Sequence, residues 1–140
     1  MPRFLGIDFG LARVGLSISD SSGAIAHPLW TIPWVDEDKL VEEIVVIIMM
    51  RKISVVVIGN PISLNGKVSQ MSKEVELFSK KLSIVLPKGV SINLFDERLS
   101  TKEAERVIKE CGGKPSIEKN AVDAVSAAII LQAFLETVNG

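Results

Sequence analysis

The first part of the chain has the hydrophobic pattern of short β-strands. Phe4–Phe9 is mostly apolar, and in Arg13–Ser19 every second residue is apolar while Gly and Ser lie between them. A period of two predicts a strand with one buried face, and the few residues between these segments suit a hairpin turn. Ala24–Ile32 is a third candidate strand, in which Pro28 favours an edge position. We therefore expect an antiparallel meander of three strands.

The pattern then changes to alternating helices and strands. Asp36–Arg51 has a broad apolar helical face, and Ile53–Ile58 is nearly all β-branched, as in strands buried on both faces. Further along we expect a helix over Ser69–Leu82, a strand over Val90–Phe95, a helix opened by a capping box of Ser100 and Glu103, and a last helix from Ser116 or Asn120 to about Thr137. This order predicts a single α/β domain over residues 1–140. Its mixed five-stranded sheet, three antiparallel and two parallel strands, would be flanked by helices.

Composition narrows the class of protein. The 140 residues are 47% hydrophobic and 24% charged, which is typical of a globular domain. One cysteine forbids an internal disulfide and a thiolate zinc cluster. The longest apolar run, Ile44–Met50, is too short to span a membrane, so we expect no membrane and a cytoplasmic location. The net charge of -1 gives no general sign of a basic nucleic-acid-binding face.

Three acidic positions lie where a carboxylate is costly or well placed for chemistry. Asp8 interrupts a strand that is otherwise apolar, where an ionised carboxylate needs a partner or a metal ion. Asp96 and Glu97 follow a predicted strand and point in opposite directions, so only one is expected to face a common site; the spacing does not say which. Asp123 lies in an apolar helix, either directed into the packing or stabilised by the helix dipole.

Carboxylate oxygens from these three places would suit magnesium or manganese. Such ions need few protein ligands, and a pair of them about 4 Å apart can hydrolyse a phosphodiester. The single histidine, His27, and Cys111 have no place in this set, and whether Asp20 or Asp96 joins it stays open. Four other large side chains are expected to belong to the core: Trp30, Trp34, Met49 and Met50.

Four blocks along the chain resemble the bacterial YqgF/RuvX family. They are Phe4–Gly10 with Arg13–Asp20, Val57–Pro61 with Asn65–Gly66, Phe95–Thr101, and Val122–Leu131. The resemblance implies a ribonuclease H-like fold and a metal-dependent nuclease that hydrolyses phosphodiester bonds with two Mg²⁺ or Mn²⁺ ions. It implies an acidic triad of Asp8, Glu97 and Asp123. The implied role is 5′-end processing of pre-16S ribosomal RNA, with structured RNA and the ribosome or its precursor as partners.

Five further residues are expected to contact nucleic acid: Arg13, Asn60, Asn65, Lys67 and Arg98. One alternative function is a Holliday-junction resolvase acting on branched DNA, which favours a homodimer over a monomer because it makes paired cuts. Another is a non-catalytic module associated with ribosomes or transcription. The segment Gly6–Gly10 also resembles the first phosphate loop of actin-like ATPases, but those proteins need two related domains.

Overall fold

The computed structural model describes residues 2–10, 12–62, 65–66, 69–111 and 121–139. Their elements are β1 (Phe4–Phe9), β2 (Arg13–Ser19), β3 (Ala26–Pro33), α1 (Glu37–Met50), β4 (Val55–Asn60), α2 (Gln70–Val85), β5 (Ser91–Asp96), a 3₁₀ turn (Glu97–Leu99), α3 (Lys102–Cys111) and α4 (Ala121–Asn139). The sheet order is β3-β2-β1-β4-β5. The pairs β1–β2 and β2–β3 are antiparallel, whereas β1–β4 and β4–β5 are parallel. The predicted mixed sheet is confirmed.

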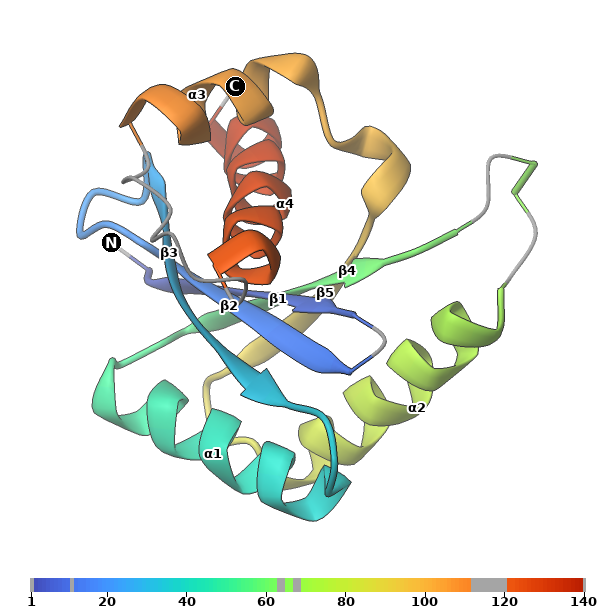
Figure 1. Ribbon diagram of the computed structural model, residues 1–140. Coiled ribbons are helices and arrows are strands. Elements are labelled where there is room, and N and C mark those ends of the chain that lie inside the picture. Colours follow the sequence, from blue (N-terminus) through green and yellow to red (C-terminus); the bar gives the residue numbers. More distant parts are fainter. Residues whose placement is uncertain (1, 11, 63–64, 67–68, 112–120, 140) are drawn as a thin grey trace.

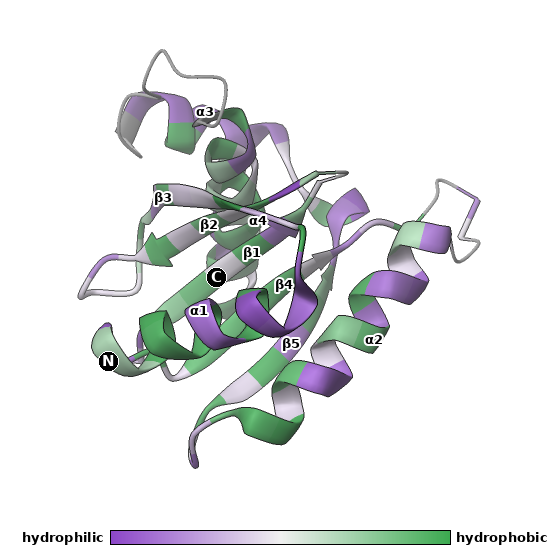
Figure 2. Cartoon of the chain, turned by 60° about the horizontal axis from the view of Figure 1, so that its bottom comes forward, coloured by the Kyte–Doolittle hydropathy of each residue, from purple (hydrophilic) through white to green (hydrophobic). Residues whose placement is uncertain are grey.

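The sheet separates two helical layers. Figure 1 shows α1 and α2 on one face and α3 and α4 on the other. Alternation along β1 assigns its side chains to these layers: Leu5, Ile7 and Phe9 belong to the core cluster with α1 and α2, whereas Phe4 belongs to the cluster with α3 and α4. Helices α1 and α2 bury apolar residues against the sheet; hydrophilic residues colour the first half of α1, whereas its second half is largely apolar (Figure 2). Asp8, two residues from Gly6, is therefore on the α4 side.

Some element boundaries differ from the sequence-based prediction. Asp20 Oδ1 accepts bonds from the backbone N–H groups of Ala24 and Ile25, which extends the turn and delays β3 to Ala26. The N–H of Ile53 donates to the carbonyl of Ile48 and completes the end of α1, so β4 begins only at Val55. The two predicted starts of the last helix, Ser116 and Asn120, lie outside the part of the chain that the structure describes.

The predicted capping box at α3 was wrong. The N–H of Ser100 donates to the carbonyl of Glu97, so this serine closes the preceding 3₁₀ turn. Thr101 caps the helix instead, because its Oγ1 accepts a hydrogen bond of 3.0 Å from the N–H of Ala104. Glu103 pairs with Arg106 at 2.6 Å rather than reaching back to the cap.

The predicted core placement of three large side chains was also wrong. Met49 and Met50 are exposed because they lie at the solvent-facing end of α1, and Trp30 is exposed because it lies on the edge strand β3. Trp34, in contrast, packs against the core. Among the described residues, α4 alone has the length and apolar composition of a membrane span, over Val122–Asn139. It has the place of a core helix, packed across β1, β2 and β3.

Helix α4 lies almost directly on the backbone of the sheet because the residues beneath it are small. A Cβ on Gly15 would overlap the carbonyl of Asp123, and one on Gly6 would be 3.0 Å from the carbonyl oxygen of Ala127. The hydroxyl of Ser17 donates a 2.9 Å hydrogen bond to that same carbonyl. These contacts fix the position of the first two turns of α4.

We expect Gly15→Ala to destabilise the fold and displace the first turn of α4. The added methyl group would overlap the backbone carbonyl of Asp123, which cannot rotate away as a side chain can. Overpacking of this kind typically costs about 1–3 kcal/mol. Urea unfolding measures the change. If the variant unfolds at the same urea concentration as the wild type, the space between α4 and β2 accommodates a methyl group and the expected clash is absent.

Candidate active site

Asp8 and Glu97 meet on the α4 side of the sheet. Asp8 lies near the end of β1, and Glu97 opens the 3₁₀ turn that follows β5. The strand between them, β4, has Gly59 at this point, where a Cβ would stand 2.7 Å from Glu97 Oε1. Glu97 can therefore extend across β4, and its side chain shares a hydrogen bond with Asp8.

The pair is held in an environment that disfavours two negative charges. Burial, and then the charge and hydrogen bond of Glu97, raise the pKa of Asp8 from its ordinary 3.8 to about 8, with a smaller contribution from Asp123. Burial is also the main cause of a raised pKa at Glu97. Two such carboxyl groups titrate together, and near neutral pH the pair retains a shared proton unless a cation replaces it.

Asp96 takes no part in this pair. Its carboxylate turns to Arg98, which donates bonds of 3.0 Å from Nε and 2.7 Å from Nη2. These bonds hold the pKa of Asp96 below its usual range. Asp20 also lies elsewhere, since it accepts bonds within its own turn. Of the adjacent acids, Glu97 is therefore the one that faces Asp8.

Asp123 lies beside the pair but is bound to a cation of the chain itself. Arg13 and Gly15 share a face of β2, and Arg13 Nε donates a 3.1 Å hydrogen bond to Asp123 Oδ2 in the first turn of α4. The negative charge of Asp123 still contributes to the raised pKa of Asp8. Within the described ranges, no group of three acidic, histidine or cysteine side chains is arranged to hold a metal ion. The structure thus joins Asp8 to Glu97 and keeps Asp123 with Arg13.

The acid pair opens into a hollow of about 330 Å³ between the sheet, α3 and α4. Three polar residues that the sequence analysis did not assign to the site line it with Asp8 and Glu97: Ser100, Glu105 and Ser126. Ser126 follows Asp123 by three residues, so helical spacing was the signal for it. Glu105 had no such signal, and its carboxylate pairs with Lys109 at 2.9 Å.

The residues expected to contact nucleic acid fall into different places. Arg13 pairs with Asp123, whereas Arg98 pairs with Asp96. Arg98 Nη1 is 3.9 Å from where a Cβ on Gly66 would stand, so it approaches the exposed loop containing Asn65. Asn60 does not fit the expectation: it is buried, and its Oδ1 accepts a 2.6 Å bond from Ser72 of α2, on the other face of the sheet. Lys67 lies outside the described residues.

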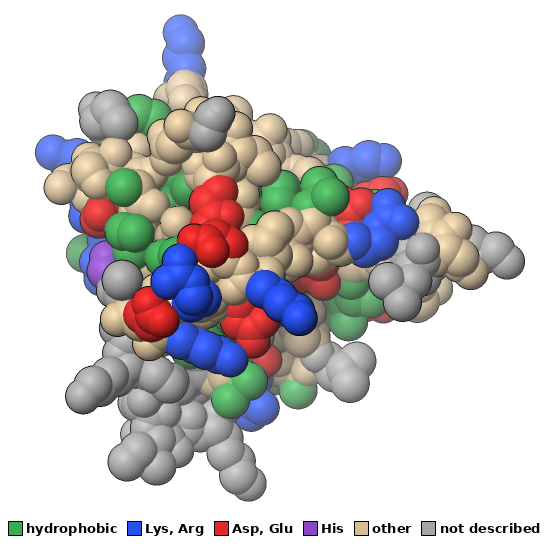
Figure 3. Space-filling model, turned by 90° about the horizontal axis from the view of Figure 1, so that it is seen from above, with side chains coloured by type: hydrophobic (Ala, Val, Ile, Leu, Met, Phe, Trp, Pro, Cys, Tyr) green, Lys and Arg blue, Asp and Glu red, His purple; other side chains and the backbone are tan. Residues whose placement is uncertain are grey.

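Charges of both signs intermingle on the surface over α3 and α4 (Figure 3). Along α3, Arg106 pairs with Glu103 and Glu110, and Lys109 pairs with Glu105. These cations are partly neutralised by their neighbours. The balanced surface agrees with the net charge of -1 of the whole chain.

Comparisons with known proteins agree with this architecture. A family model described as RuvX, Holliday junction resolvase, matches residues 2–137. The chain belongs to the RuvX family. Two RuvX relatives carry the name "Putative pre-16S rRNA nuclease": one from Chloroflexus aggregans is 35% identical, covering 94% of this chain and 92% of the relative, and one from Ruminiclostridium cellulolyticum is 39% identical, covering 99% and 96%.

Solved structures show the same fold at low sequence identity. RuvC of T. thermophilus in complex with a Holliday junction substrate has a TM-score of 0.68 and 13% identity, over 100% of this RuvX chain and 97% of that chain. The fowlpox virus resolvase with Holliday junction DNA has a TM-score of 0.61 and 10% identity, over 99% of both chains. The fold is therefore of the ribonuclease H-like class expected from the sequence.

The RuvX acids fit a hard divalent cation by their chemistry. Asp8 and Glu97 present only oxygen ligands, which Mg²⁺ and Mn²⁺ favour, and a cation would relieve the repulsion that now requires a shared proton. Asp123 fits the same set only once it is released from Arg13. All three side chains therefore offer the carboxylate oxygens that such an ion prefers, but only Asp8 and Glu97 are in contact with each other.

We expect Asp8→Asn to stabilise the metal-free protein at alkaline pH. The folded state retains a proton on Asp8 that the unfolded chain releases, so its stability falls as pH rises from about 4 to about 8. The amide removes this loss, and the gain should grow by at most about 1.4 kcal/mol per pH unit before levelling. Unfolding curves at several pH values in a chelator measure it.

Asp96→Asn is the control for this pH series. Its carboxylate has a lowered pKa because Arg98 binds it, so the substitution should give no gain at any pH. An Asp8→Asn protein whose stability runs parallel to that of the wild type from pH 4 to pH 9 would contradict the shared proton.

Proposed function

We propose that this RuvX protein is a metal-dependent nuclease that hydrolyses phosphodiester bonds in the hollow lined by Asp8 and Glu97. The observation that carries the proposal is the half-buried carboxyl pair, which has more negative charge than its surroundings tolerate without a proton or a cation. The family match and the names of the relatives support a hydrolase that acts on ester bonds of nucleic acid. The proposed cofactor is Mg²⁺ or Mn²⁺.

The proposed ligands are the carboxylates of Asp8, Glu97 and Asp123. Divalent ions held there would activate a water molecule and neutralise charge on the scissile phosphate. Asp8 and Glu97 would give up their shared proton on binding. The hydroxyl groups of Ser100 and Ser126, which line the same hollow, can donate hydrogen bonds to phosphate oxygens. Arg98, beside the loop of Gly66, is suited to hold the backbone of the nucleic acid.

The substrate we favour is structured RNA at the 5′ end of pre-16S ribosomal RNA. The names of relatives at 35–39% identity over nearly the whole chain support it. We therefore also propose a cytoplasmic location with the ribosome precursor as partner. The family description, and two structural relatives that bind Holliday junctions, favour four-way DNA as the second candidate substrate.

Removal of either carboxylate of the Asp8–Glu97 pair should abolish cleavage. We expect Asp8→Asn and Glu97→Gln to lower the Mn²⁺-dependent rate at least 100-fold, since the proposed ions would lose a ligand. Labelled pre-16S RNA and a mobile four-way DNA junction, incubated in parallel with and without Mn²⁺, measure activity and substrate preference together. Asp96→Asn is the matched control and should keep most of the activity, because that acid pairs with Arg98 instead.

Two results would remove the proposal. One is full activity in the Asp8→Asn protein, which would mean that the acid pair is not the catalytic site. The other is binding of both nucleic acids without cleavage under any divalent metal, which would favour the non-catalytic module.

Arg13 is proposed to exchange Asp123 for a substrate phosphate. Its guanidinium now neutralises Asp123, and its side chain is 44% exposed, so a phosphate can reach it. Binding of substrate would then free Asp123 to join the other two acids. Metal affinity and substrate binding would thus be coupled through one side chain.

We expect Arg13→Gln to bind Mn²⁺ several-fold more tightly in the absence of substrate, because Asp123 loses its internal cation, and to raise KM for nucleic acid. Calorimetric titration with Mn²⁺ and a KM measurement test the two effects. Arg106→Gln, which removes an exposed arginine of α3 with acidic partners of its own, is the control for net charge. Metal affinity that is equal or lower in Arg13→Gln would refute the exchange.

A further inference from the structure

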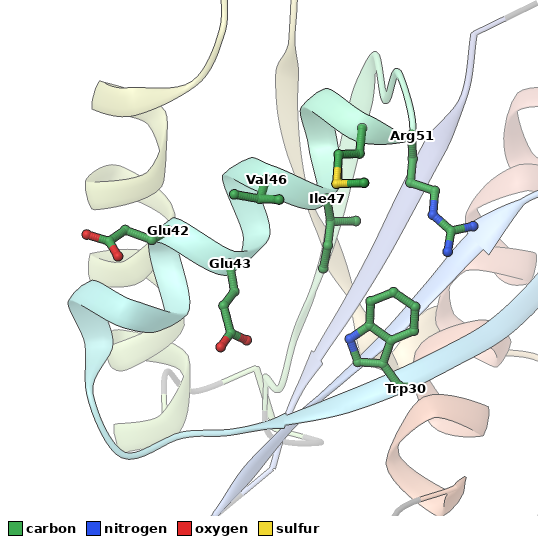
Figure 4. Close-up of a pocket in the computed structure, with 7 residues that line it drawn as sticks. Trp30, Glu42, Glu43, Val46, Ile47 and Arg51 are labelled. Atoms are coloured by element: carbon green, nitrogen blue, oxygen red, sulfur yellow. The ribbon is translucent and has the colours of Figure 1, made fainter.

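The outward face of α1 is apolar over its second half. Val46, Met49 and Met50 are 51%, 64% and 79% exposed, and their spacing places them on one stripe of the helix. Trp30 of the edge strand β3, 44% exposed, lies next to this stripe. A hollow of about 470 Å³ lies between α1 and Trp30 (Figure 4). A grouped exposed apolar surface of this kind usually marks an interaction site.

Charged residues of opposite sign lie at the two ends of this hollow. Glu42 and Glu43 are at one end, and Arg51 is at the other with its guanidinium over the ring of Trp30, 5.6 Å from the centroid (Figure 4). In the described part of the chain, none of these three charged side chains has an ion-pair partner, in contrast to Glu37 and Asp38, which pair with Lys81. The face therefore has an apolar centre between an acidic end and a basic end.

The spacing of these residues makes the face complementary to itself. With a rise of about 1.5 Å per residue, Glu42 lies about 6 Å before Val46 along the helix and Arg51 about 7.5 Å after it. When two such helices run antiparallel about an axis near Val46 and Ile47, the acidic end of each faces the basic end of the other. The apolar centres then meet across the axis.

We propose that a second copy of this chain docks on this face, with the two α1 helices antiparallel about a two-fold axis. Self-complementary charge is what an isologous interface requires, whereas a different partner would need no such symmetry. Helix α1 covers the opposite face of the sheet from α4, so the hollow at Asp8 stays open in both copies (Figure 1). The inference does not depend on the proposed nuclease activity.

The contact is small, which sets the conditions of the test. One helical face and a tryptophan bury less than the roughly 800 Å² per partner of a standard stable interface, so we expect a dimer with micromolar affinity. Sedimentation velocity over about 5–500 µM protein should show a monomer converting to a dimer. Val46→Glu should keep the chain monomeric throughout, and Ile84→Glu, at an 82% exposed apolar position of α2, is the matched control that should leave dimerisation unchanged.

Charge reversal tests the antiparallel arrangement. Arg51→Glu alone, or Glu42→Arg with Glu43→Arg, places like charges opposite each other and should weaken self-association at least tenfold. A mixture of these two proteins restores opposite charges at both ends and should form a heterodimer at wild-type strength. All positions are exposed or at the helix end, and circular dichroism verifies folding.

Each other outcome counts against the proposal. A wild-type monomer at 500 µM would overturn it and leave the face to a different partner. A dimer that persists in Val46→Glu would place the interface elsewhere. Failure of the mixed charge variants to associate would exclude the antiparallel two-fold arrangement.

Discussion

The close contact of α4 with β1 and β2 determines where the acidic residues lie. Gly6 and Gly15 let the helix backbone rest on the sheet, and the bond from Ser17 to the carbonyl of Ala127 fixes its position. As a result, the first two turns of α4 carry Asp123 to Arg13 and Ser126 to the hollow at Asp8. A larger side chain under the helix would separate these groups, so Gly6 and Gly15 help to form the site although they have no side chain.

A second close approach completes the acid pair. Gly59 leaves room for Glu97 to cross β4 and contact Asp8, so the pair forms over a strand that contributes only backbone there. Burial then makes the pair unfavourable in the fully ionised form. Sites that bind charge commonly carry such a cost in stability, which a bound ion offsets. The arrangement accounts for a carboxylate near the end of an apolar strand better than any role in folding does.

Much of the fold was predictable because alternation and helix periodicity are local. The period of two in β2 correctly placed Val14, Leu16 and Ile18 on one face, but the prediction that only this face is buried was wrong. Helix α4 covers the opposite face, so Ser17 and Ser19 are buried too. The family resemblance pointed to Glu97, but residue spacing alone did not decide between Asp96 and Glu97, because the choice depends on the 3₁₀ turn and on Arg98, which binds Asp96. The same turn engages Ser100 and moved the helix cap to Thr101.

Contacts between segments far apart in the chain could not be predicted from the sequence. Arg13 and Asp123 are separated by 110 residues, and no spacing rule links them. Asn60 was misplaced for a different reason: β4 is buried on both faces, so its hydropathy gives no sign of which side each residue takes. Continued alternation from Val56 and Ile58 turns Asn60 toward α2 and away from Asp8.

Anomalous diffraction from crystals soaked in Mn²⁺ tests the proposed metal site most directly. We expect a Mn²⁺ peak within bonding distance of carboxylate oxygens from both Asp8 and Glu97, and loss of that peak in Asp8→Asn crystals. A peak at other carboxylates, or Asp8 and Glu97 still in mutual contact without metal at saturating Mn²⁺, would contradict it.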